Sequence, residues 1–423
     1  MQTFLIIWLG QFASLLGSEM TNFAITIWAW DVTGKATPLA LILVVTQIPR
    51  LLISPFAGIW VDRFNRKYLM LLGDTLAGLS TIVLLILFTT GHLQIWHLYI
   101  SSAINGLFGH IQGLAYATSV SLIVPKHHYV RASALKSLQM SGGYLFAPAM
   151  AGALYAITGL GGILTFDLVT FGIATISLST VAIPQPTEQD SSKSVSSGKM
   201  LEQLTFGVRY LWRNLSLKTL LSFIMIMNII NSICQTILPA MLLARSGNNT
   251  TAVGTLFSCF GAGGLLGGVI LSIWGGPKRR IHGLLIADAI SKTGLIMLAL
   301  AQQTYVRLGA ALVGGFCLPF SGSCSEAIWQ SKIEPEKQGR VFAARFLLSR
   351  LVTPLGAMIA GPLADYAFEP AMQPGGALTK PFGNVLGVGL GAGMALQMLL
   401  FASLGVLISL GGYGVRSLRQ VED

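Results

Sequence analysis

The sequence predicts an all-α membrane protein with twelve transmembrane helices arranged as two pseudo-symmetric six-helix bundles. Of its 423 residues, 53% are hydrophobic and only 10% are charged, which is too apolar for a soluble protein of this size. Apolar stretches of ~20 residues, the length that a helix needs to cross the hydrocarbon core, recur from one end of the chain to the other. The bilayer therefore has to serve as the solvent for most of the chain.

The predicted spans are largely apolar stretches bounded by polar or charged residues. The first of them lacks a basic leader and carries Glu19 in its middle, so we interpret it as a permanent span rather than a cleaved signal peptide. We place the spans at residues 4–30, 38–60, 68–90, 95–124, 134–157, 162–183, 217–243, 252–274, 281–302, 306–329, 346–367 and 383–411.

One long polar stretch, Gln185 to Gly198, separates six spans from six, and its serine-rich composition is typical of a flexible linker. After it, Met200 to Trp212 places leucines and a valine on one helical face, which predicts an amphipathic helix on the inner leaflet or a lead-in to the seventh span; the two are compatible. We expect an N-terminal bundle at 1–183, a cytoplasmic linker at 184–215, a C-terminal bundle at 216–413 and a cytoplasmic tail at 414–423.

The charge distribution predicts the orientation. A net charge of +11 would suit a nucleic-acid binder. If the N-terminus is cytoplasmic, however, most Lys and Arg residues fall in or beside inner loops, and only Lys35, Arg245, Arg307 and Lys380 lie outside. This asymmetry follows the positive-inside rule, so we expect a multi-pass protein of the cell inner (plasma) membrane with both termini cytoplasmic, in contact with lipid and not with nucleic acid.

Internal duplication is visible when the two halves are compared at an offset of about 210 residues. Two homologous bundles imply alternating access, in which the halves rock about a central site. The matching features are the loops at Pro125 and Pro335, Arg131 and Arg340, Gly58 and Gly268, and Asp74 and Asp288.

The loop after the second span carries a G-x-x-x-D-R-x-x-R-K pattern, in which the chain resembles the major facilitator superfamily. It reads Gly58-Ile59-Trp60-Val61-Asp62-Arg63-Phe64-Asn65-Arg66-Lys67. The resemblance implies a major facilitator fold and a conformational gate in which Asp62 latches the two halves in one alternating state. We assign to this gate Gly58, Asp62, Arg63, Arg66, Lys67, Arg340 and Arg345.

The position of Asp62 supports this reading independently. It lies at the C-terminal end of its helix, where the helix dipole disfavours an anion, so it needs a partner. Arg66, Lys67 or the start of the eleventh helix are the candidates. In the eleventh span, Arg345 and Arg350 lie near the inner gate, where Asp62 or Glu326 can pair with them.

The fifth span resembles the antiporter motif of drug exporters, G-x-x-x-G-P-x-x-G-G, with alanine replacing two glycines. Small residues there allow close helix approach and the proline bends the span; ordinary small-residue packing is the alternative. The motif positions are Gly143, Ala147, Pro148, Ala151 and Gly152. With Phe206 to Arg213 and Thr353 to Asp365, the chain resembles the macrolide-efflux and enterobactin-exporter branch of the drug:proton antiporters.

A carboxylate in the middle of a span is evidence of a function, because inserting an ionised carboxylate into the bilayer costs about 2.5 to 3.5 kcal/mol. We interpret Glu19 as the proton-coupling carboxylate and Arg50, at a similar depth in the second span, as its counter-ion. The fourth span matches the tail of the superfamily's R-x-x-Q-G motif but has Gly109 at the arginine position, so Arg50 is left to supply the cation. A static ion pair between two helices is the alternative.

Polar and aromatic residues on apolar spans mark the predicted substrate cavity, although interhelical hydrogen bonds or simple packing would also explain them. They are Asn22, Phe23, Thr26, Gln47, Asn105, Gln112, Gln139, Asn228, Asn231, Gln235 and Phe320. We expect Asp288 and Lys292 to neutralise each other at i, i+4 spacing. Asp167, Asp365 and Glu326 lie near span ends, where we expect water to reach them, and we interpret them as structural.

No P-loop, nucleophile triad or metal-ligand spacing is present, so we predict neither an enzyme nor a cofactor or metal. The expected function is proton-coupled efflux of amphipathic small molecules such as macrolide-like drugs, siderophores or peptide natural products, by a multidrug-resistance antiporter. The partners would be substrate, protons and membrane lipid, and we expect a monomer. Proton-coupled metabolite uptake, lysophospholipid flipping and a non-transporting membrane sensor are the alternatives.

Overall fold

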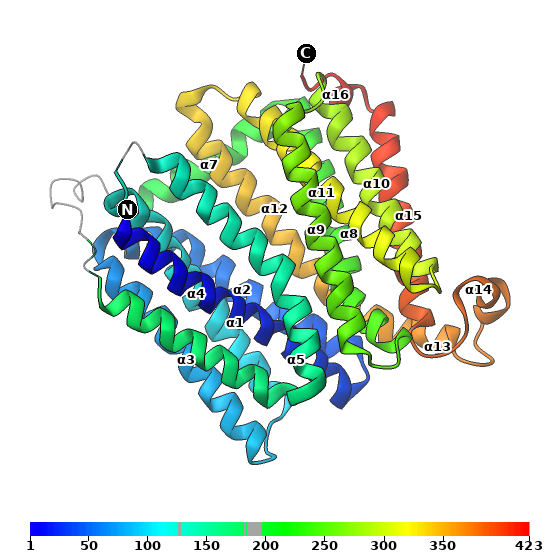
Figure 1. Ribbon diagram of the computed structural model, residues 1–423. Coiled ribbons are helices and arrows are strands. Elements are labelled where there is room, and N and C mark those ends of the chain that lie inside the picture. Colours follow the sequence, from blue (N-terminus) through cyan, green and yellow to red (C-terminus); the bar gives the residue numbers. More distant parts are fainter. Residues whose placement is uncertain (126–127, 182, 184–196, 423) are drawn as a thin grey trace. The chain divides into compact units, whose positions relative to one another are not determined.

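The computed structural model describes residues 1–125, 128–181, 183 and 197–422, and every regular element in them is a helix. The first half contains α1 (Gln2–Thr33), α2 (Ala36–Arg63), α3 (Arg66–Thr89), α4 (Ile95–Ile123) and α5 (Tyr129–Ser179) (Figure 1). The second contains α7 (Ser197–Arg213), α8 (Leu215–Arg245), α9 (Thr250–Trp274), α10 (Arg280–Leu300), α11 (Thr304–Lys332), α12 (Pro335–Leu363) and α15 (Ala392–Gly411). Shorter elements are η2 (Ala364–Phe368), α13 (Glu369–Met372), α14 (Thr379–Leu386), η3 (Gly412–Gly414) and α16 (Arg416–Arg419).

Ten helices in the described residues are long and apolar enough to cross a membrane. One of them, α5, breaks at Gly159, whose φ of 64° and ψ of −163° favour glycine, and each arm is about as long as a span requires. Counting the two arms of α5 separately and adding α4, a helix of 29 residues, gives the twelve spans that the sequence predicts.

The last predicted span starts too early. Its first residues form the separate helix α14, and α15 begins only at Ala392. Between them Gly387, Gly389 and Gly391 have φ values of 82°, 108° and 84°, which end one helix and start the next. Apolar composition alone does not reveal these left-handed turns. The eleventh helix, by contrast, extends back to Pro335, because proline is favourable in the first turn of a helix.

The helices form two compact units. The first consists of Met1–Gly34, the described residues of 41–195 and Thr250–Thr255, and the second consists of Lys35–Ala40 and the described residues of 196–249 and 256–423. In the first unit α1 packs along α5, and α3 packs along α4 and α5. In the second, α10 packs on α11 and α15, and α8 packs on α12 and α15.

The amphipathic segment is helical, as predicted, and packs within the second unit. Leu211 of α7 is fully buried, and a Cβ on Gly207 would lie 2.5 Å from the Arg340 carbonyl of α12. The Arg340 guanidinium lies 5.1 Å from the centre of the Phe206 ring. One described face of α7 is therefore covered by protein, whereas Trp212 is 54% exposed and remains available to the membrane surface.

Candidate transport site

Glu19 lies midway along α1 and is half-buried. The Asn22 amide and Arg50 of α2 both lie within electrostatic reach of its carboxylate. A Cβ on Gly143 of α5 would lie 3.9 Å from Glu19 Cγ and 3.3 Å from Leu15 Cδ2. Position 143 of α5 therefore lies within van der Waals range of the acid, and its tighter contact is with Leu15.

Arg50 is exposed and also lies within electrostatic reach of His110 on α4. No ion pair within 4.0 Å joins Glu19 and Arg50, both of which belong to the described part of the chain. The two charges are therefore neighbours without direct contact, and three helices of the first unit contribute titratable groups to this region. Such an arrangement leaves the carboxylate free to exchange a proton without first breaking a salt bridge.

The loop between α2 and α3 is stabilised by its own side chains. The Asn65 amide oxygen caps α3 by accepting from the backbone N–H groups of Lys67 (3.0 Å) and Tyr68 (3.4 Å). Lys67 Nζ donates to the carbonyls of Ser179 (2.9 Å) and Val181 (2.7 Å) at the end of α5, where the helix dipole favours a cation. These contacts fasten the start of α3 to the end of α5.

The other gate residues in this loop have different surroundings. Arg66 is buried and donates to the Thr118 carbonyl of α4 at 2.9 Å. Gly58 has open space where a Cβ would lie, and Arg63 is exposed at the end of α2. The side chain of Asp62, the predicted latch, lies outside the described residues, so its partner stays a prediction.

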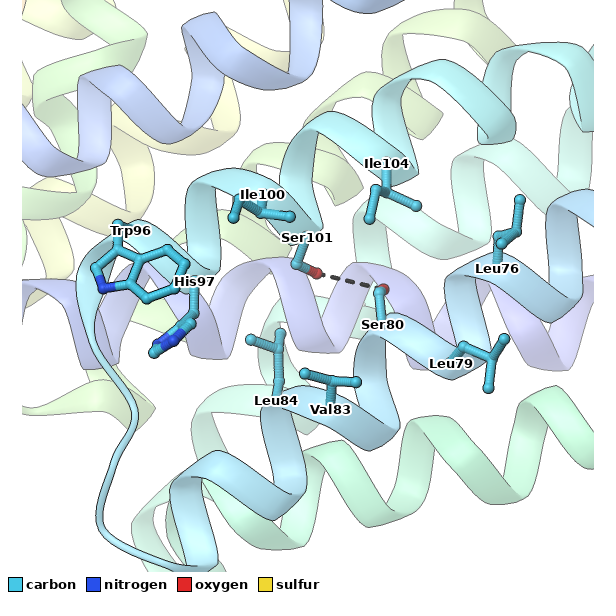
Figure 2. A pocket seen from close by; sticks show the side chains of 10 residues that line it. All are labelled: Leu76, Leu79, Ser80, Val83, Leu84, Trp96, His97, Ile100, Ser101 and Ile104. Atoms are coloured by element: carbon cyan, nitrogen blue, oxygen red, sulfur yellow. Dashed lines mark hydrogen bonds between the residues drawn. The ribbon is translucent and has the colours of Figure 1, made fainter.

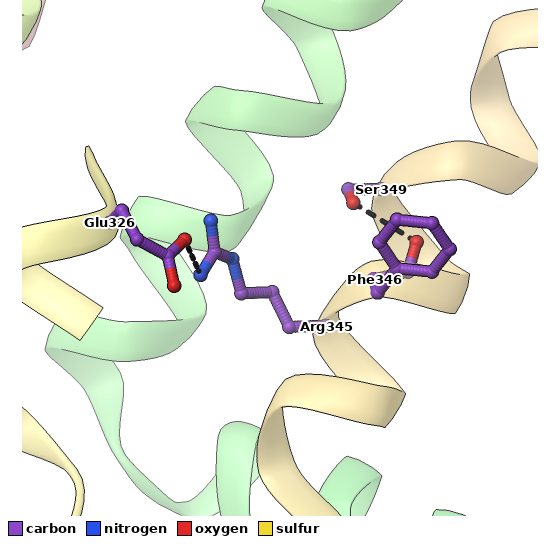
Figure 3. Close-up of polar contacts among 4 residues, drawn as sticks. All are labelled: Glu326, Arg345, Phe346 and Ser349. Carbon is purple, nitrogen blue, oxygen red and sulfur yellow. Dashed lines mark hydrogen bonds and ion pairs between the residues drawn. The ribbon is translucent and has the colours of Figure 1, made fainter. Parts of the chain in front are cut away.

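Arg345 pairs with Glu326, one of the two partners that the sequence suggested. Figure 3 shows the contact between α12 and α11, with 2.8 Å between Arg345 Nη1 and Glu326 Oε2. The guanidinium also lies 4.9 Å from the centre of the Trp329 ring. Arg345 thus joins α12 to α11, whereas Arg340 joins α12 to α7.

The second half of the antiporter-like motif packs against the first turn of α9, which belongs to the same unit. A Cβ on Gly152 would lie 2.6 Å from the Thr250 carbonyl, and one on Gly254 would overlap the Pro148 carbonyl. The Thr250 hydroxyl donates to the Gly152 carbonyl at 3.1 Å. Ala147 and Ala151 are fully buried beside this contact, so the small residues serve close packing here.

Among the predicted substrate residues of the first unit, two have clear side-chain partners. Asn105 Nδ2 donates to Ser80 Oγ at 3.1 Å, and Gln112 Nε2 donates to Gln11 Oε1 at 2.6 Å. Gln139 is buried, and its Oε1 has no hydrogen-bond partner within the part that the structure describes. The remaining ones are Asn22, which is exposed, and Phe23, Thr26 and Gln47, which are half-buried.

In the second unit the predicted substrate residues mostly meet protein. Asn228 Nδ2 donates to the Ser349 carbonyl at 3.0 Å, and Asn231 Oδ1 accepts from Lys292 Nζ at 2.9 Å. Phe320 lies 5.3 Å from Phe316, measured between ring centres. Gln235 is half-buried. Asn228 and Asn231 thus make the interhelical hydrogen bonds that the alternative interpretation expected.

The expected neutralisation of Asp288 by Lys292 is not seen as a direct contact. No ion pair within 4.0 Å joins these two described residues. Lys292 is 4% exposed and donates to Asn231 of α8, while Asp288 Oδ1 accepts from Ser321 of α11 at 2.7 Å. Each buried charge takes a hydrogen-bond partner from a different neighbouring helix, which is what desolvation demands.

Of the carboxylates that we expected at water-accessible span ends, Asp167 is enclosed by the protein, whereas Asp365 is half-buried. Asp167 is 6% exposed and accepts from the Thr81 hydroxyl at 3.0 Å. Asp365 accepts from the backbone N–H groups of Ala36 and Thr37, both at 2.8 Å, and so caps the start of α2. Hydropathy places these acids near span ends, but it does not show which helix covers them.

A hollow of about 390 Å³ lies between α3 and α4 (Figure 2), and the predicted substrate residue Asn105 hydrogen-bonds to two of its lining residues, Ser80 and Ser101. Its wall includes the exposed side chains of Leu79, Val83 and Trp96. The Ser101 hydroxyl donates to Ser80 Oγ at 3.3 Å beneath them. None of the eleven substrate-site predictions is among its lining residues.

Bundles of membrane-spanning helices that enclose charged and polar side chains define a polytopic membrane protein. The Major Facilitator Superfamily profile matches residues 7–357, and the chain belongs to this superfamily. The predicted all-helical major facilitator fold is thereby confirmed, as is the multi-pass membrane character of the protein.

Relatives of known name are distant. The chain is 26% identical over 366 residues to macrolide efflux protein A of Streptococcus pyogenes, covering 86% of this chain and 89% of that protein. It is 23% identical over 366 residues to the multidrug efflux pump Tap of Mycolicibacterium fortuitum, covering 84% and 88%. The crystal structure of the nucleoside transporter NupG superimposes with a TM-score of 0.71 at 12% identity over 97% of this chain and 98% of that one, which shows the fold alone.

Proposed function

We propose that this protein exports amphipathic small molecules of the macrolide, siderophore or peptide type in exchange for protons, by alternating access. The observation that carries the proposal is the setting of Glu19. It is a half-buried acid midway along α1, with Arg50 near it but not in contact and Gly143 packed against it. Similarity to macrolide efflux protein A and to the multidrug efflux pump Tap supports export as the direction.

Protonation of Glu19 changes the balance of charge in this region. The ionised carboxylate is attracted to the Asn22 amide and to the Arg50 guanidinium, which lie near it. A proton on Glu19 cancels that attraction and leaves the exposed Arg50 uncompensated. Because Asn22 and Arg50 are both exposed, a substrate in the same region competes with Glu19 for them, so proton binding and substrate binding become linked.

The same proposal includes the setting of the protein. The positive-inside asymmetry supports a cell inner membrane location with both termini and the linker cytoplasmic. Substrate, protons and lipid are the partners, and the working unit is a monomer. The gate formed by the α2–α3 loop, Arg340 and Arg345 would govern the alternation between states.

Everted membrane vesicles test the function, with radiolabelled erythromycin as the probe and respiration as the source of the proton gradient. We expect gradient-dependent accumulation that an ionophore abolishes. Glu19→Gln should reduce it about tenfold or more, because the neutral amide cannot exchange a proton. Asp31→Asn, which neutralises an exposed acid of the same helix, is the matched control and should stay within about twofold.

Full gradient-driven accumulation in the Glu19→Gln variant would contradict the coupling role. Absence of accumulation by the wild-type protein, across macrolides and a panel of amphipathic drugs, would contradict efflux. That result would direct attention to metabolite uptake, lysophospholipid flipping or a sensor role.

A further inference from the structure

A second acid lies deep in the first unit and is held by uncharged groups. Asp74 of α3 is 7% exposed. Its Oδ2 accepts from Gln11 Nε2 of α1 at 3.0 Å, and its Oδ1 accepts from Gln112 Nε2 of α4 at 3.2 Å. Gln112 Nε2 also donates to Gln11 Oε1 at 2.6 Å. Three side chains from three helices thus close a ring of hydrogen bonds, which we call the amide ring.

No cation within 4.0 Å neutralises Asp74 in the part of the chain that the structure describes. On its own helix the nearest charges are Lys67 and Arg66, seven and eight residues earlier; Lys67 donates to the Ser179 and Val181 carbonyls, and Arg66 donates to the Thr118 carbonyl. On α4 the titratable groups nearest to Gln112 in the sequence are His110, two residues earlier and within electrostatic reach of Arg50, and Tyr116, one turn later. An ionised carboxylate enclosed in this way is costly, and binding a proton removes that cost.

The titratable groups on the other helices that pack against α3 have partners of their own. On α5, Asp167 accepts from Thr81, which lies two turns from Asp74, or about 10 Å along α3. On α1, Glu19 lies within electrostatic reach of Asn22 and Arg50. Within the described residues, Asp74 therefore shares no hydrogen bond with Glu19 or with Asp167.

Open space lies beside the amide ring. Gly109 and Gly113, on either side of Gln112 in α4, are exposed, and a Cβ on either would meet nothing within 4 Å. One turn earlier Gly106 packs tightly on the Thr46 carbonyl of α2. Arg50, one turn beyond Thr46, is exposed on this side, and an exposed guanidinium at this depth marks an aqueous surface rather than a lipid one.

Asp167 has no comparable open space beside it in the described residues. A Cβ on Gly17 of α1 would lie 2.8 Å from Asp167 Oδ1 and would overlap the Thr170 hydroxyl, so the α1 backbone covers this acid. The two buried acids of the first unit therefore differ in access to water. Asp74 is the one beside an opening.

We propose that Asp74 is a second proton-binding site of this transporter, reached through the opening at Gly109 and Gly113. A proton from water forms an O–H bond with one carboxylate oxygen and later returns to water, and no other bond changes. The amide ring suits both forms, because a glutamine amide donates through Nε2 to the carboxylate and, when reversed, accepts a carboxyl O–H through Oε1. The coupling of this proton to transport rests on the proposed function. The binding of the proton to Asp74 does not.

Infrared difference spectroscopy of the full-length protein in lipid nanodiscs, titrated with acid, tests proton binding directly. A buried carboxylic acid has its own C=O stretching band. We expect Asp74→Asn to remove one titrating band that both Glu19→Gln and Asp167→Asn retain, and Asp74→Glu to restore a titrating band. Asp74→Asn spectra identical to those of the wild type would overturn the proposal. The proposal would also fail if Glu19→Gln removed every titrating carboxylic-acid band, because no band would then be left for Asp74.

Erythromycin accumulation in everted vesicles then tests the role of this proton. Asp74→Asn should lose about tenfold or more of the gradient-driven accumulation, whereas Asp167→Asn, equally buried but enclosed, should stay within about twofold. Asp74→Glu should recover part of the loss, which a purely structural role would not predict for the larger side chain. Wild-type transport by Asp74→Asn would overturn the coupling role. If the wild type does not accumulate erythromycin while the Asp74 band titrates, the proposed function fails and the proton site stands.

Discussion

Lys292 and Asp288 illustrate how individual charges are accommodated inside the bundles. Their i, i+4 spacing on α10 predicts a pair, yet each bonds to a neutral side chain of another helix, Asn231 and Ser321 respectively. Asp74 follows the same pattern with its glutamines. Neutral donors and acceptors satisfy a buried charge without fixing its protonation state, which suits groups that exchange protons better than a salt bridge does.

At the same scale, the Asn65 cap makes a quantitative prediction. Asn65→Ala removes the acceptor for two backbone N–H groups at the start of α3 and should lower stability by about 1 kcal/mol. Asn65→Asp keeps a capping oxygen and serves as the control. Thermal unfolding of the purified variants in detergent measures the effect, and equal midpoints for Asn65→Ala and the wild type would contradict the cap.

Helices are the elements that composition predicts best, and their interruptions are the elements that it predicts worst. Apolar length located the spans, and the linker was evident from its polarity. The break at Gly159 and the turns at Gly387 and Gly391 depend on single backbone conformations, which an apolar average does not register. The covered face of α7 likewise depends on how closely α12 approaches it.

The contact between α5 and the first turn of α9 gives a prediction at the element scale. Gly152→Val places side-chain atoms where the Thr250 carbonyl lies, and overpacking of this kind costs about 1 to 3 kcal/mol. We expect reduced thermal stability in detergent together with loss of transport. Gly172→Ala, on the second arm of the same helix where a Cβ meets nothing within 4 Å, should leave both unchanged. Normal stability of Gly152→Val would show that the two backbones are not in close contact.

At the scale of the whole molecule, the two units repeat one architecture, and the repeat extends to buried charge. Asp74 on α3 and Asp288 on α10, matched in the duplicated sequence, are both held by neutral side chains. Their surroundings have diverged, because Lys292 lies one turn beyond Asp288 and within its electrostatic reach without a direct ion pair, whereas Asp74 is held by two glutamine amides. The two bundles therefore share a fold but differ in the charged groups around the matched acid. This difference is consistent with the proposal that the first bundle binds the protons.

Orientation is also a property of the whole molecule, and it can be tested by topology reporters. The loop that contains Arg63, Arg66 and Lys67 should be cytoplasmic, and the loop at Gly91 should be on the other side. Alkaline phosphatase fused after Gly91 should therefore be active, whereas fusions after Phe64 or at the C-terminus should be inactive. The reverse pattern of activities would contradict the predicted orientation.

The sequence by itself determined the superfamily, the approximate spans, the repeat and the gate-loop motif. These features depend on local composition and on short motifs, which can be recognised without knowing how the helices pack. Only the tertiary structure decided which residues are in contact. Gln11 and Gln112 hydrogen-bond to Asp74, Gly143 lies next to Glu19, and Arg345 pairs with Glu326. Those contacts depend on how each helix is rotated about its axis and on how closely its neighbour approaches. Side chains far apart in the chain set both, and no local pattern encodes them.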